Sequence, residues 1–223
     1  MKSNQELQTD VQNALKWEPL LHAAEIGVTA KDGIVSLTGV VSSYAKKMEA
    51  ESAAKKVIGV RALVEDIKVK FPSAWSKTNV EIADEVLSAL NSNSSIPKDK
   101  VKVKVEDGWI TLEGELPWNY QKEIAKKSVQ YLTGVTGVTN NIKIKSEVHD
   151  AIEKKDVEDA IKRSWSIDDS DIKVSVSGTT VTLTGTVDSW YQRDEAARIA
   201  WNTPGIWHVN NELIVEYHHA FVD

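Results

Sequence analysis

Few side chains in this sequence are of the types that catalyse reactions or bind metal ions. The chain has no cysteine, which excludes disulfides and thiolate ligands. Its five histidines show no H-E-x-x-H motif or other spacing typical of zinc sites. The adjacent pair His218-His219 predicts a solvated tail, with weak binding of a divalent ion as the alternative. No nucleophile–base pair is evident, so we predict no enzyme activity, no catalytic residue, no metal site and no cofactor.

One short motif could indicate RNA binding. Gly134-Val135-Thr136-Gly137 has the G-x-x-G spacing of the loop in KH domains. In those domains the loop joins two helices, whereas here it would join a helix to a strand. The charge is also unfavourable, because residues 1–75 and 76–146 each carry a net +1 and residues 147–223 carry −8. We therefore predict no nucleic-acid partner.

A group of lysines could instead contact anionic phospholipids. Alternation of apolar and polar residues places four lysines on the outer face of one predicted sheet, with an indole at its edge: Lys102, Lys104, Lys143, Lys145 and Trp109. Each basic residue close to anionic headgroups contributes on the order of 1 kcal/mol. A solvated sheet face is the alternative. A third possibility is that this face docks on the acidic third of the chain.

Aromatic residues recur at one structural location, the start of the helix predicted to follow each sheet hairpin. They are Tyr44, Trp118, Tyr120, Trp190 and Tyr191. Such a recurring group either covers the edge of the core or forms an exposed contact surface for a membrane or a protein. Three further tryptophans near the unit ends, Trp17, Trp75 and Trp165, are expected to pack between units.

The elements that position these residues come from an internal repeat. Residues 32–39 recur as 107–114 and 178–185, at offsets of 75 and 71, and a further glycine follows each copy after twenty residues. This self-similarity predicts three domains, residues 1–71, 76–146 and 147–217, called repeats 1, 2 and 3 below. Their structural glycines are Gly33, Gly39, Gly59, Gly108, Gly114, Gly134, Gly178, Gly185 and Gly205.

Each repeat shows the same order of elements. An amphipathic helix comes first, and Ser3 with Glu6 and Thr78 with Glu81 fit capping boxes. An alternating strand, a glycine turn and a returning strand that ends at the next glycine predict a hairpin. A second helix, capped by the last glycine, leads to a third strand, which a right-handed crossover makes parallel to the second. We predict an α+β fold of three tandem αββαβ units, each a three-stranded mixed sheet with two helices on one face.

The D-G-x-V-x-L-x-G hairpin, the twenty-residue gap and the closing G-V-x-x-V-x-N-x-I resemble the BON domain (bacterial OsmY and nodulation). Repeat 2 matches best, with Gly134-Val135, Val138, Asn140 or Asn141, and Ile142. Repeat 1 has Glu65-Asp66 in place of the asparagines, and repeat 3 keeps Asn210-Asn211. The resemblance implies a non-enzymatic module of bacterial envelope and stress proteins, which binds phospholipid and is also described as transport-associated.

The leading hypothesis is a triple BON protein that binds phospholipid membrane surfaces, with Lys102, Lys104, Lys143, Trp109 and Trp118 as its main contacts. The alternative is a homo-oligomeric scaffold, or a transport-associated carrier of small ligands or metal ions. The sequence as it stands shows no signal peptide. A cytoplasmic location is therefore expected, and a periplasmic one if a leader has been removed.

Overall fold

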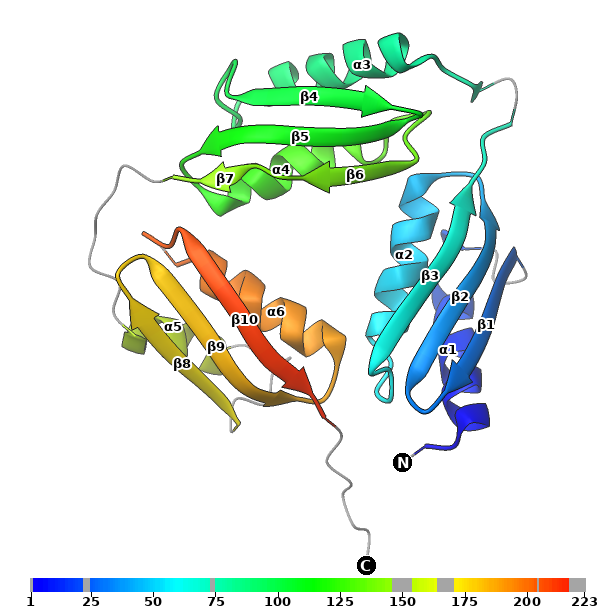
Figure 1. Ribbon diagram of the computed structural model, residues 1–223, viewed down its shortest axis with the longest axis vertical. Coiled ribbons are helices and arrows are strands. Elements are labelled where there is room, and N and C mark those ends of the chain that lie inside the picture. The colour runs from blue at the N-terminus through cyan, green and yellow to red at the C-terminus, as the bar shows by residue number, and fades with distance from the viewer. Residues whose placement is uncertain are drawn as a thin grey trace, which may run out of the picture. The chain divides into compact units, whose positions relative to one another are not determined.

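Each repeat folds around its own sheet in the computed structural model (Figure 1). The structure describes residues 2–21, 25–72, 75–145, 154–163, 171–203 and 205–216. Repeat 1 comprises α1 (Asn4–Trp17), β1 (Ile26–Lys31), β2 (Ile34–Val41), α2 (Tyr44–Lys55) and β3 (Ala62–Val69). Repeat 2 comprises α3 (Asn79–Ser92), β4 (Val101–Glu106), β5 (Trp109–Leu116), α4 (Asn119–Val129), β6 (Gly137–Asn140) and β7 (Lys143–Ile144). Repeat 3 comprises α5 (Lys154–Lys162), β8 (Ile172–Ser177), β9 (Thr180–Val187), α6 (Trp190–Trp201) and β10 (His208–Val215).

The predicted topology is confirmed. The central strand of each sheet is β2, β5 or β9. In repeats 2 and 3 it pairs antiparallel with the first strand and parallel with the last. Both capping boxes are present: Ser3 and Thr78 each accept a hydrogen bond from the backbone of the glutamate three residues on, whose carboxylate accepts one in return.

The hairpin turns follow their sequences. Asp107 and Gly108 both have positive φ, 50° and 76°, as a type I′ turn requires, and Asp32-Gly33 is the same. In repeat 3, only Gly178 of the Gly178-Thr179 turn has positive φ, at 57°, which is typical of type II′. The turn of repeat 3 therefore differs in type from those of repeats 1 and 2.

The sequence suggested that each returning strand ends at the second glycine of its repeat. In the structure these strands continue beyond it. β5 runs two residues beyond Gly114 to the fully buried Leu116, and β2 and β9 extend likewise. Gly114 has a φ of 143°, and a β-carbon there would collide with the carbonyl oxygen of Lys100 on the neighbouring segment. The glycine therefore allows a close approach of two chain segments within the sheet.

The last glycine of each repeat is not a helix cap either. α4 ends at Val129, and Gly134 lies five residues later, in the turn that leads to β6. A β-carbon on Gly134 would lie 2.9 Å from Cδ1 of Ile82 on α3. This glycine therefore lets the turn pack against the first helix, and Gly59 does the same against Leu7 of α1.

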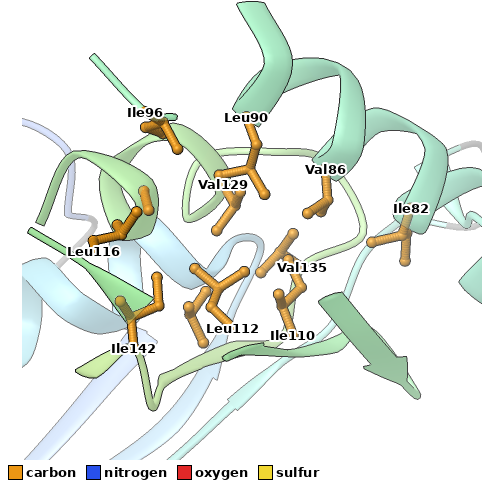
Figure 2. Packing of buried hydrophobic residues seen from close by; sticks show 12 residues of the cluster. Ile82, Val86, Leu90, Ile96, Ile110, Leu112, Leu116, Val129, Val135 and Ile142 are labelled. Atoms are coloured by element: carbon orange, nitrogen blue, oxygen red, sulfur yellow. The ribbon is translucent and has the colours of Figure 1, made fainter. Parts of the chain in front are cut away.

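The core of repeat 2 shows why both helices lie on one face of the sheet. Figure 2 shows Ile82, Val86 and Leu90 of α3 above Ile110 and Leu112 of β5, with Val129 of α4 in the same cluster. These side chains are 5 % exposed or less. Burial of apolar surface between the sheet and the two helices is therefore the main stabilising contribution within the repeat.

The closing strand of repeat 2 is interrupted, whereas one continuous strand was expected. β6 ends at Asn140, whose side-chain oxygen accepts a hydrogen bond from the backbone N–H of Ile142 at 3.3 Å. Its amide nitrogen donates to the carbonyl of Lys122 on α4 at 2.9 Å. One asparagine thus ties the second helix to the edge strand. Asn211 makes the same two contacts in repeat 3, with Arg193 and Leu213.

Spatial contacts divide the chain differently from the repeats. One compact unit contains residues 1–39, 49–67 and 150–223, and the other contains residues 40–48 and 68–149. Repeats 1 and 3 thus share a unit, except that the end of β2, the start of α2 and the end of β3 belong with repeat 2.

Candidate functional site

The outer face of the repeat 2 sheet holds most of the predicted contact residues. Lys102 and Lys104 lie on β4, Lys143 lies on β7, and Lys145 follows it; all four are exposed. Strand pairing sets Lys102 opposite Glu113 and Lys143 opposite Glu115. Each of these lysines therefore faces a carboxylate across the ladder.

Two further contacts pair charges on this face. Lys104 Nζ lies 2.9 Å from Glu106, and Lys145 Nζ lies 3.4 Å from Glu115. All four side chains are more than half exposed, so each pair stabilises the fold by about 1 kcal/mol or less. The face therefore carries four lysines and three glutamates. The glutamates partly offset the positive charge and weaken its attraction for an anionic surface. The same alternation that identified the lysines places Glu113 and Glu115 on β5 beside them.

Trp109 lies on this face as predicted, but it is held by its neighbours. Its indole lies over Gly137, where an added β-carbon would contact the ring, 2.8 Å from Cδ2. Its Nε1 donates to the hydroxyl of Thr139 at 2.9 Å, and its side chain remains 45 % exposed. The second glycine of the G-x-x-G motif therefore makes room for an indole.

The aromatic residues near the second helices separate into three groups. Trp118 is half-buried at the N-cap of α4. Tyr120 and Tyr191, at equivalent positions in α4 and α6, are exposed. Trp190 is half-buried at the first residue of α6, and Tyr44 occupies that position in α2. Trp118 and Trp190 are thus one position apart, so the aromatic residues do not form a single recurring surface.

Exposed apolar residues in repeat 1 were not predicted as contacts. Trp17 at the end of α1 is 85 % exposed, so the prediction that it packs between units is wrong. Leu20 is also exposed, and Lys16 beside Trp17 is a neighbouring cation. Trp75 is 58 % exposed, and Trp165 lies outside the described residues. Sequence alone could not show that α1 leaves its last tryptophan uncovered.

Electrostatics do not single out a catalytic group. Burial lowers the pKa of Lys122. The backbone N–H and the hydroxyl of Thr78 lower the pKa of Glu81 by hydrogen bonding to its carboxylate. In the part of the chain that the structure describes, no three or more His, Cys, Asp or Glu side chains are grouped as metal ligands would be. His218 and His219 lie outside that part.

These αββαβ units match a known family over most of the chain. The BON domain model matches residues 3–70, 78–146 and 149–217. The chain belongs to the BON domain family. It carries three tandem BON domains, and the family is generally non-enzymatic and linked to interaction with phospholipid membranes. None of the described helices is long and apolar enough to cross a bilayer.

The chain is distantly similar to Osmotically-inducible protein Y of Escherichia coli (strain K12), with 27 % identity over 129 residues. The match covers 56 % of this chain and 64 % of the relative's length.

Among solved structures, the chain aligns with CdsD, a structural protein of the type III secretion system of Chlamydia trachomatis. The match is 14 % identical and covers 95 % of this chain and 92 % of that one, with a TM-score of 0.26. The C-terminal domain of CdsD aligns at 15 % identity, also with a TM-score of 0.26, and covers 97 % of this chain and 100 % of that one.

Proposed function

We propose that this triple BON protein binds anionic phospholipid surfaces peripherally, without enzymatic activity, in the manner of bacterial envelope and stress proteins. The observation that carries the proposal is the exposed indole of Trp17, which is 85 % exposed and lies beside Lys16. Tryptophan next to a cation is typical of side chains that anchor at the interface between headgroups and acyl chains. The family's general link to phospholipid membranes supports the same function.

The lysine face of repeat 2 is a second candidate contact. Its four lysines are partly offset by Glu106, Glu113 and Glu115. We therefore propose that it adds a weak, salt-dependent attraction, while Trp17 provides the apolar contact. Two weak contacts on one chain act together, because binding through one raises the effective concentration of the other at the surface.

Co-sedimentation with phosphatidylglycerol vesicles tests this function, with phosphatidylcholine vesicles as the uncharged comparison. We expect binding at low salt that weakens as salt is added. Trp17→Ser should reduce binding several-fold, and Lys102→Gln should reduce it less. Lys173→Gln is the matched control, because Lys173 is exposed at the position in repeat 3 equivalent to Lys102. Absence of binding to anionic vesicles at low salt would contradict the proposal.

A homo-oligomeric scaffold remains the second candidate. It is favoured by three exposed apolar side chains in the sheet of repeat 1, namely Ile34 (46 %), Val40 (44 %) and Val64 (51 %). Exposed apolar side chains on a sheet can serve as an interface between copies of a protein. Light scattering separates the candidates, since a scaffold should increase in mass with concentration and a membrane-binding monomer should not.

A further inference from the structure

The first residue of the second helix differs among the three repeats. It is Tyr44 in α2, Asn119 in α4 and Trp190 in α6. Tyr44 packs against the hydrophobic core of repeat 2. Trp190 donates a hydrogen bond from Nε1 to the carbonyl oxygen of Arg61 in repeat 1, at 3.0 Å. Where this position is aromatic, it contacts another repeat. We propose that it is a docking position between repeats, and that Trp190 binds repeat 3 to repeat 1 of the same chain.

Repeat 3 holds Trp190 in place by contacts of its own. The hydroxyl of Ser189 caps α6 by accepting a hydrogen bond from the backbone N–H of Gln192. The guanidinium of Arg193 lies 5.1 Å from the centroid of the Trp190 ring. Arg193 is itself fixed, because it donates to the carbonyls of Leu213 at 3.0 Å and Asn211 at 2.8 Å. An indole positioned in this way loses little conformational freedom on docking.

The acceptor in repeat 1 is fixed to a similar degree. Arg61 donates its backbone N–H to the carbonyl of Gly33 at 2.7 Å. Its side chain packs on the hairpin turn, where a β-carbon on Gly33 would lie 2.7 Å from Cδ of Arg61. The Arg61 carbonyl is therefore positioned by the β1–β2 turn, so that a specific hydrogen bond joins two ordered groups.

An ion pair near Trp190 adds little to the contact. Lys55 lies 3.7 Å from Asp194, but both side chains are partly exposed, at 28 % and 54 %, and such pairs contribute little. A cleft of about 560 Å³ remains between the two repeats, lined on one side by residues that include Ile34 and Arg61. Because Trp190 donates the hydrogen bond that joins the two repeats, we expect the contact to depend on this residue, and one substitution should release it.

The experiment uses the full-length chain, which has no cysteine of its own. Spin labels on Thr29→Cys in repeat 1 and Lys173→Cys in repeat 3, both exposed positions, report the distance between the repeats. With Trp190 present, we expect a narrow distance distribution. Trp190→Asn, which introduces the residue found at position 119, should broaden it at least two-fold. Tyr191→Asn, the matched control at the exposed neighbouring tyrosine, should leave it narrow.

The proposal is overturned if the distribution is broad with Trp190 present, or stays narrow in Trp190→Asn. If Trp190→Asn fails to fold, Trp190→Phe decides instead, because it keeps an aromatic ring beside Arg193 but removes the indole N–H donor. A narrow distribution that disappears when labelled chains are diluted with excess unlabelled protein would place the contact between copies. That result would also overturn docking within one chain.

Discussion

The indole of Trp109 lies across the β5–β6 ladder on Gly137, its directly paired partner. A hydrogen bond from Nε1 to the Thr139 hydroxyl, at 2.9 Å, fixes the ring in this position. Repeat 1 has Ile34 and Ala62 at the equivalent positions, and repeat 3 has Thr180 and His208. Among the three repeats, glycine thus occurs at this position only in repeat 2, where the paired residue on the neighbouring strand is a tryptophan.

The contact between Trp109 and Gly137 predicts that a substitution at one position compensates for a substitution at the other. Gly137→Ala should lower the free energy of unfolding by about 1–3 kcal/mol, because the β-carbon collides with the indole. Trp109→Ile/Gly137→Ala, which reproduces the pair found in repeat 1, should recover most of that loss. Urea denaturation followed by circular dichroism measures each variant. Additive effects of the two substitutions would show that the ring and the glycine are not coupled.

Gly114 should be far less tolerant of a side chain than Gly27. Gly114→Ala should destabilise repeat 2 by about 2–4 kcal/mol, because it combines a positive φ with a collision against a backbone carbonyl. Gly27→Ala is the control, since its β-carbon would meet only the rotatable hydroxyl of Thr38, at 2.8 Å. We expect less than about 1 kcal/mol for that change. Thermal unfolding of both variants gives the comparison, and equal losses would refute our account of Gly114.

Asn140 and Asn141 are neighbours with different expected roles. Asn140→Ala should cost about 1–3 kcal/mol, because it leaves the carbonyl of Lys122 and the N–H of Ile142 without their side-chain partner. Asn141 is exposed, so Asn141→Ala should change stability little. Hydrogen exchange at the Ile142 amide is the sharper measurement. It should accelerate in the Asn140 variant alone.

The capping boxes predict a dependence of stability on acidity. Hydrogen bonds from the backbone N–H and hydroxyl of Thr78 lower the pKa of Glu81, and Ser3 does the same for Glu6. Since the folded pKa lies below the unfolded one, this contribution is complete above the unfolded value. It is lost as the pH falls through the folded value. Glu81→Gln should therefore flatten the decline in stability in this acidic range. Carboxylate chemical shifts followed by NMR give the pKa directly, and an unshifted Glu81 would contradict the prediction.

The features predicted well from the sequence were local. Caps, hairpin turns and strand alternation depend on residues a few positions apart, and their physical causes act within that distance. The roles of Gly114 and Gly134 were predicted wrongly, because each depends on an atom of another element, the Lys100 carbonyl or the Ile82 side chain. The exposure of Trp17 and the contact of Trp190 with Arg61 also depend on tertiary structure.

For the candidate site, the sequence predicted the positions of the charged residues but not their pairing. Alternation placed the repeat 2 lysines on the exposed face of the sheet, and the same alternation could have placed Glu113 and Glu115 beside them. Their pairing with Lys102 and Lys143 required the strand register. A count of charges along the chain is therefore a poor guide to the electrostatic potential at a sheet face, because charges paired across neighbouring strands determine that potential.

Arg193 has one more consequence, which concerns aggregation. β10 is the edge strand of its sheet, and the carbonyls of Asn211 and Leu213 that Arg193 binds point away from β9. The side-chain oxygen of Asn211 also accepts a hydrogen bond from the backbone N–H of Leu213. An incoming strand would find these groups already hydrogen-bonded, so repeat 3 cannot readily be extended at that edge. The same arginine that supports the indole of Trp190 thus protects the β10 edge of repeat 3 against strand addition.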